Sequence, residues 1–140
     1  MDYKKYRVRT PVKTFRDLEV YQATTNLSAE LFNLKMPNKY KRNKNVAEEM
    51  NNLREASKMV PRLIVESYSD KFSDLDLASQ KLEKAAAAVN ILVGKMDFIS
   101  AIVDDPDFRA NLSEILNRYQ RNKMRIINLK RAWNRVWGKR

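Results

Sequence analysis

The sequence predicts an all-α fold, and three observations support it. Only two glycines and four prolines occur in 140 residues, so tight turns are few. The helix-favouring residues Leu, Ala, Glu, Lys and Arg are abundant. Apolar residues recur at helical spacing over four long stretches. Because 44% of the chain is apolar, one core can form, and we expect a single up-down-up-down four-helix bundle over residues 14–137.

The first predicted helix spans 14–35 and follows a basic N-terminal arm, 1–13, which lacks helical periodicity. Thr14 and Asp17 are spaced like a capping box at the start of this helix. The next residues, 36–44, contain proline, asparagine and concentrated positive charge. Such a composition is typical of a surface connection rather than a continued helix.

The second predicted helix spans 45–69 and contains Pro61. Proline removes one backbone hydrogen bond and presses against the carbonyl group of Ser57, which produces either a kink or a break. We expect a kink, because the apolar pattern keeps its phase on both sides of the proline.

The third predicted helix spans 74–103. Ser73 stands three residues before Asp76, which resembles a helix cap. The alanine run at 85–88 is expected to permit close approach of a neighbouring helix, and Gly94 is expected to do the same. In the predicted core of this helix Leu77 is followed by Leu82, Ala85, Val89, Leu92, Met96 and Ile99.

The fourth predicted helix spans 107–137 and is followed by a short basic tail, 138–140. Three aspartates and a proline at 104–107 suit a helix start. Short connections make neighbouring helices antiparallel. The basic arm and the C-terminal half of the fourth helix should therefore lie at one end of the bundle, and the 36–44 connection should lie beside the acidic turn at the other.

The chain is strongly basic, with 28 Lys and Arg against 17 Asp and Glu. Such an excess attracts phosphate or anionic lipid over about 8 Å at physiological salt. The last 23 residues contain nine basic residues and no acid. On a helical wheel, five arginines of the fourth helix lie opposite its apolar stripe: Arg118, Arg121, Arg125, Arg131 and Arg135.

Arginine can hold phosphate through two parallel hydrogen bonds and can stack on bases, so this face predicts RNA or another single strand as partner. The alternative is that these residues complement the helix dipole and keep the surface solvated. A second candidate contact is the basic connection, where an aromatic ring suited to base stacking lies among cations: Lys39, Tyr40, Lys41 and Arg42.

Other residues of the fourth helix have two interpretations. Lys123 and Lys130 lie at the edge of the apolar stripe, where long stems cover hydrophobic surface while the amines reach water. They could form subunit contacts or line a positive channel. Trp133 and Trp137 are four residues apart, and we expect core or oligomer contacts rather than base stacking. Val136 is expected in the apolar stripe.

Cysteine and histidine are both absent, which excludes disulfides, most nucleophilic triads, the usual zinc sites and the usual proton shuttle. The acids at Glu48, Glu49 and 104–107 lack the spacing of a calcium loop. Gly94 and Gly138 stand alone, so no phosphate-cradling glycine loop is present. We expect no enzyme activity, no cofactor, no metal and no small-molecule substrate.

The first residues lack the apolar stretch of a signal peptide, and no run approaches 18 apolar residues. We therefore expect a cytoplasmic protein that does not span a membrane. A basic amphipathic C-terminal helix could still lie on anionic lipid or serve as a scaffold, but its apolar face is needed for the bundle.

Several short segments carry a family resemblance: the apolar-Pro-Lys connection from Leu31 through Met36-Pro37-Asn38-Lys39, Val46-Ala47-Glu48-Glu49-Met50, Val65-Glu66-Ser67-Tyr68 and Leu82-Glu83-Lys84-Ala85. Through them the stretch from Ala29 to Ile102 resembles the accessory variability determinant (Avd) proteins of diversity-generating retroelements. Phe15 to Gln22 and Pro61 are similar to the related 23S rRNA intervening-sequence proteins, which share the four-helix bundle. Both relatives form homopentameric rings.

The first resemblance implies a protein that binds the element's reverse transcriptase and its template RNA, with cDNA as a further partner, and assists mutagenic cDNA synthesis without performing chemistry. The second implies a bundle protein with general nucleic-acid binding and no polymerase partner. One departure concerns the contact surface: many family members end the fourth helix with a Gly-Gly-Trp-like segment, whereas this chain has Asn128-Leu129-Lys130-Arg131-Ala132-Trp133.

Overall fold

The computed structural model describes residues 12–138, and all regular structure in that range is helical. The predicted all-α class is confirmed. The described residues form five α-helices: α2 (Glu19–Asn33), α3 (Lys44–Ser57), α4 (Met59–Asp70), α5 (Leu75–Ile102) and α6 (Pro106–Trp137). Two short 3-10 turns, η1 (Phe15–Asp17) and η2 (Asn38–Tyr40), lie in the connections.

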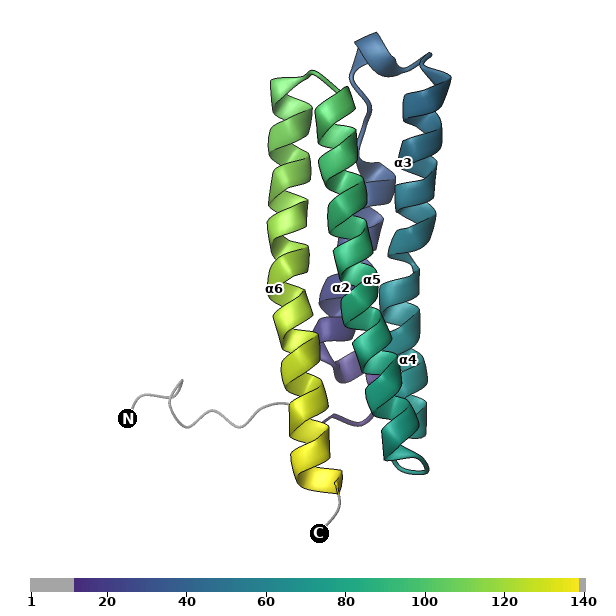
Figure 1. Ribbon diagram of the computed structural model, residues 1–140, viewed down its shortest axis with the longest axis vertical. Helices are drawn as coiled ribbons and strands as arrows, with labels where there is room; N and C mark the ends of the chain where they lie inside the picture. Colours follow the sequence, from purple (N-terminus) through teal and green to yellow (C-terminus); the bar gives the residue numbers. More distant parts are fainter. Residues whose placement is uncertain (1–11, 139–140) are drawn as a thin grey trace, which may run out of the picture.

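The helices form a bundle of four rods, because α4 continues the rod begun by α3 (Figure 1). α2 packs against α3, α4 and α6, and α5 packs against the same three helices. The connection after α2 meets the turn before α6 at one end, where the Tyr40 hydroxyl accepts a hydrogen bond from the Asp104 amide (2.9 Å). The turn between α4 and α5 lies at the other end, near the C-terminal end of α6 (Figure 1).

The core lies along the bundle axis and draws on every α-helix. Its largest fully buried side chains are Tyr119, Leu27, Leu31, Met50, Leu53, Ile64, Leu82, Leu92, Met96, Ile99, Leu112 and Ile126. Each aliphatic member contributes about 1.5–3 kcal/mol relative to an exposed position. Sequence periodicity misplaced two residues: Leu77 and Val136 were expected in the apolar stripes but are 37% and 50% exposed.

The predicted start of the first helix at Thr14 is wrong, although its capping box exists. The Thr14 hydroxyl accepts from the Arg16 amide (3.2 Å), and Asp17 accepts from the Thr14 amide (3.2 Å). These bonds close the 3-10 turn η1 rather than an α-helix, because Leu18 is extended (φ −72°, ψ 124°). The α-helix begins only at Glu19.

Pro61 has a stronger effect than the predicted kink. It has no amide proton to donate to the Ser57 carbonyl, and the helix is interrupted at Lys58. Lys58 keeps right-handed helical angles (φ −67°, ψ −23°). The hydrogen-bonded helix therefore breaks into α3 and α4, while the rod continues (Figure 1).

The start of α5 is capped by a different residue from the one expected. The Asp74 carboxylate accepts from the Leu77 amide (3.0 Å), whereas the Ser73 hydroxyl donates to the Asp70 carbonyl (3.3 Å). Gly94 also differs from expectation. It is exposed, and a Cβ there would meet no described atom within 4 Å, so none of the described helices approaches it closely.

The helix α6 begins as its sequence indicates. The Asp105 carboxylate accepts from the Phe108 amide (2.9 Å), and Pro106 is the first helical residue. Proline suits this position because it has no amide proton that needs a partner there. The acidic turn at 104–107 thus fixes where the long basic helix starts.

By length and composition, one described helix could cross a membrane: an 18-residue window of α5 has a mean hydropathy of 1.5. In the bundle, the inner side of α5 forms part of the core through Leu82, Val89 and Leu92, which are fully buried. A core helix of a bundle requires the same apolar composition, so this property by itself assigns no membrane location.

Candidate nucleic-acid interface

The outer side of α6 carries four exposed arginines that lie opposite its buried residues: Arg121, Arg125, Arg131 and Arg135. None of them pairs with a carboxylate in the described part of the chain. The last acid of α6 is Glu114. At 1.5 Å rise per residue, the four guanidinium groups are distributed over roughly 21 Å of helix. They form a row of unpaired positive charges.

Arg118 differs from these four, because it forms a bidentate ion pair with Glu30 of α2. Its two terminal nitrogens donate to the two carboxylate oxygens at 2.7 and 2.5 Å. The hydrogen bonds that Arg118 donates to Glu30 are the main reason that the pKa of Arg118 is raised. The guanidinium fork that would hold a phosphate is therefore occupied. Arg118 joins α2 to α6, a role hidden from sequence reasoning because the partners are 88 residues apart.

Lys130 is also used inside the chain. Its amine pairs with Glu83 of α5. One helical turn further along α6, the side-chain amide of Asn134 donates to the Ser79 hydroxyl (3.0 Å). These two contacts hold the C-terminal half of α6 against α5. They differ from both sequence interpretations of Lys130, which were a subunit contact and a channel lining.

The connection around η2 contributes three more exposed cations: Lys39, Lys41 and Arg42. Among the described residues, none of these cations forms an ion pair with the neighbouring acidic turn, and Asp104 pairs with Arg109 (3.5 Å). Tyr40 is half-buried, packs against the core and accepts a hydrogen bond from Asp104. Lys39 lies 5.6 Å from the centre of its ring. Tyr40 thus tethers this end of the bundle, which leaves less of its ring for base stacking.

The structure does not bring the two basic groups into one patch. The η2 connection lies beside the start of α6, while Arg131 and Arg135 lie in the last two turns of that helix (Figure 1). The predicted arm, 1–13, lies almost wholly outside the described residues, and so do the last two residues of the predicted tail, 138–140. The row on α6 is therefore the main candidate interface.

Sequence reasoning missed an aromatic cluster at the α4–α5 turn. The amine of Lys71 lies between 4.2 and 5.9 Å from the ring centres of Tyr68, Phe72, Trp133 and Trp137. Trp133 is 6% exposed, as expected for a core residue, but Trp137 is 47% exposed. The signal in the sequence was two pairs of aromatic residues, each pair four residues apart. Trp133 and Trp137 both lie in α6, whereas Tyr68 lies in α4 and Phe72 in the turn that follows it.

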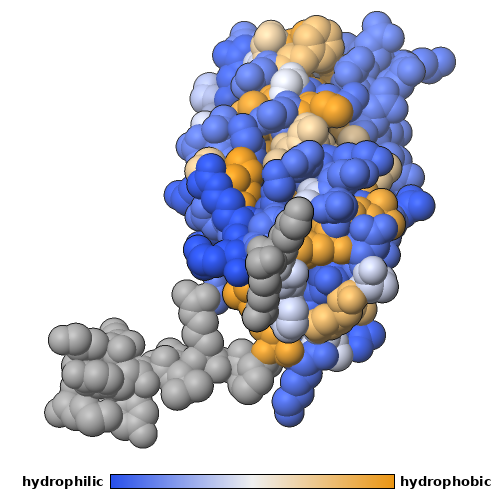
Figure 2. Space-filling view, turned by 60° about the horizontal axis from the view of Figure 1, so that its bottom comes forward, coloured by the Kyte–Doolittle hydropathy of each residue, from blue (hydrophilic) through white to orange (hydrophobic). Residues whose placement is uncertain are grey.

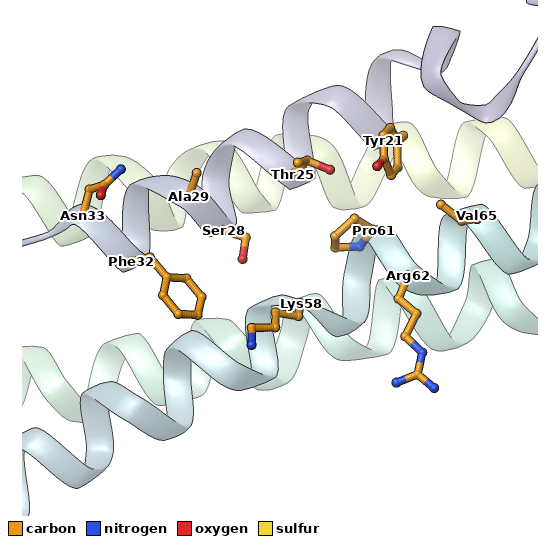
Figure 3. A pocket seen from close by; sticks show the side chains of 10 residues that line it. All are labelled: Tyr21, Thr25, Ser28, Ala29, Phe32, Asn33, Lys58, Pro61, Arg62 and Val65. Carbon is orange, nitrogen blue, oxygen red and sulfur yellow. The ribbon is translucent and has the colours of Figure 1, made fainter.

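A groove of about 560 Å³ lies between α2 and the α3–α4 rod, at the interruption. Phe32 and Lys58 point toward one another across it, whereas Arg62 points away from α2 (Figure 3). Both cations already have partners, since Lys58 pairs with Glu55 and Arg62 with Glu66. The groove is therefore mainly apolar and adds no unpaired charge for a polyanion.

No protein-family model, curated protein or solved structure matches this chain significantly. The resemblance to the Avd proteins thus remains a prediction.

Proposed function

We propose that this protein is a non-catalytic accessory protein that binds a retroelement reverse transcriptase and its template RNA and supports mutagenic cDNA synthesis. One observation carries the RNA-binding part: the row of four unpaired, exposed arginines on α6. The polymerase partner and the cDNA contact rest on the sequence resemblance.

The row suits a flexible, sequence-tolerant contact with phosphates. Each phosphate neutralised on a single strand contributes about 0.7 to the slope of log affinity against log salt. Four arginines would therefore contribute a slope of about 3, which is a loss of roughly 50-fold between 50 and 200 mM salt. The net charge of +11 adds long-range attraction.

The proposal includes an up-down-up-down bundle assembled into a homopentameric ring. Exposed apolar side chains on the outer side of α5, Ile91 and Phe98, support subunit contacts, since they are 59% and 52% exposed. Large apolar side chains gathered on one face often mark a protein interface. Sedimentation of the purified protein measures the subunit number directly.

Salt titration of RNA binding tests the central claim. The variant replaces Arg121, Arg125, Arg131 and Arg135 with glutamine. The control replaces four cations outside α6 with glutamine: Lys58, Arg62, Lys84 and Lys95. Both variants lose four charges, so the global field falls equally. For the α6 variant we expect the slope of log affinity against log salt to become shallower by about 3. For the control we expect a change less than a third as large. Equal changes in the two variants would contradict the proposal.

A pulldown with a reverse transcriptase encoded beside this chain tests the partner. Capture that persists after nuclease treatment supports direct binding, and capture abolished by nuclease indicates that RNA bridges the two proteins. RNA binding without any capture would instead favour the intervening-sequence type of protein. Flotation with anionic liposomes in the absence of RNA would favour a membrane-surface role.

A further inference from the structure

The aromatic cluster around Lys71 lies at the end of the bundle where α4 turns into α5. The Lys71 amine is 4.2 Å from the ring centre of Tyr68 and 4.6 Å from that of Phe72. The rings of Trp133 and Trp137 are 5.1 and 5.9 Å away. No carboxylate pairs with Lys71 in the described part of the chain. The cluster thus holds a cation that has π faces around it and no counter-anion among residues 12–138.

The four rings divide into an inner and an outer pair. Tyr68 and Trp133 pack edge to face at 6.4 Å, and Trp133 is buried. Phe72 and Trp137 pack edge to face at 5.3 Å, but they are 67% and 47% exposed. Hydrophobic surface is visible at this end among hydrophilic side chains (Figure 2). The inner pair completes the core, whereas the outer pair presents aromatic surface to solvent.

The charge of Lys71 is partly desolvated. Burial lowers the pKa of Lys71, while the surrounding π faces favour its charged form. A partly desolvated cation gains more from an incoming anion than a fully hydrated one, because screening by water is weaker there. The cluster therefore offers two complementary features side by side: aromatic rings for a flat apolar group and a cation for an anion.

We propose that Phe72 and Trp137 stack on unpaired bases of single-stranded RNA and that Lys71 pairs with an adjacent phosphate. A nucleotide combines a flat ring with an anion, which matches the two features of the cluster. This inference rests on the proposed RNA binding and adds a preference for unpaired strands.

The test compares an oligoadenylate RNA strand with a blunt RNA duplex of equal length. The variants are Phe72→Leu, Trp137→Leu and the double variant. The control is Phe32→Leu in α2, because Phe32 is 45% exposed, has the Lys58 amine 5.3 Å from its ring centre and lies outside the cluster. Leucine keeps apolar bulk but removes the π face. We expect each stacking variant to bind the single strand at least about five-fold more weakly, with duplex affinity and salt slope unchanged. The control should bind both RNAs as the wild type does.

Tryptophan fluorescence gives a second readout, because the chain has only Trp133 and Trp137. We expect the single strand to quench wild-type emission and to quench Trp137→Leu much less. Equal single-strand affinity of the double variant and the wild type would overturn the inference, and so would equal losses for strand and duplex. A wild-type oligomer that the double variant disperses, with RNA affinity unchanged, would show that the rings contact a second copy instead. A wild type that binds neither RNA would overturn the proposed function as well.

Discussion

Arg54 fixes the C-terminal end of α2, and its removal should destabilise the whole bundle. Its Nε donates to the Leu31 carbonyl (2.9 Å), and its Nη2 donates to the Leu34 carbonyl (2.8 Å). Carbonyl groups at a helix end have no partner within the helix. Arg54 of α3 supplies these partners across the interface with α2, and it thereby sets where the η2 connection departs.

The expected cost follows from these two bonds. A hydrogen bond that involves a charged group contributes about 1.5–3 kcal/mol, so Arg54→Met should lower the free energy of unfolding by about 3 kcal/mol. Methionine keeps most of the aliphatic stem, so lost packing is a small part of this. In a domain of this size the change corresponds to a fall in Tm of roughly 10 °C.

Urea denaturation followed by circular dichroism measures the effect, with Arg62→Met as matched control. Arg62 is 70% exposed at its side chain, and its one ion-pair partner in the described part of the chain is Glu66, four residues further along α4. Its loss should therefore cost at most about 0.5 kcal/mol. If the free energies of unfolding of Arg54→Met and Arg62→Met agreed within about 0.5 kcal/mol, the role given to Arg54 would be refuted.

Three further changes have defined outcomes. Hydrogen bonds from the backbone amides of Lys13 and Thr14 lower the pKa of Asp17. The stabilising effect of the Asp17 carboxylate is therefore complete above about pH 4 and is lost as the pH falls through the lowered pKa. The stability of Asp17→Asn should depend less on acid pH than that of the wild type, as measured by unfolding. Gly94→Ala should stabilise the fold by about 1 kcal/mol in urea denaturation, because no described residue obstructs the added methyl group; destabilisation would indicate an obstruction. The buried Tyr119 hydroxyl has no hydrogen-bond partner among the described residues, so thermal unfolding of Tyr119→Phe should match or exceed the wild type in Tm.

Sequence patterns predicted those parts of the fold that depend on local spacing. Apolar periodicity located each rod, and Asp105 with Pro106 marked the start of α6. Errors arose where two local signals compete. Thr14 and Asp17 form a real capping box, but it closes a 3-10 turn because the backbone extends at Leu18. Similarly, the apolar pattern keeps its phase across Pro61, so α3 and α4 lie in one rod. Proline nevertheless lacks the amide proton for a helical hydrogen bond, and the helix is interrupted there.

The candidate site was only partly predictable, because long-range pairing decides which cations remain unpaired. Composition and the helical wheel placed Arg121, Arg125, Arg131 and Arg135 on one exposed side, but they grouped Arg118 with them. Its partner Glu30 lies in another helix, and only the packed bundle brings the two together. The same reason applies to Lys71, whose aromatic neighbours come from two distant segments of the chain.

The unequal lengths of α2 and α6 have a further consequence. With 15 and 32 residues, they are about 22 and 48 Å long, so α2 flanks only the middle of its partner, near the Glu30 contact. At the end of the bundle that holds the α4–α5 turn, α6 extends beyond the start of α2, so this end is thinner than the middle (Figure 1). A thinner section buries less apolar surface per residue and opens locally at lower cost. A ligand bound there would therefore suppress local opening at this end of the molecule. Its binding would be measured as slower amide hydrogen exchange in the last turns of α6.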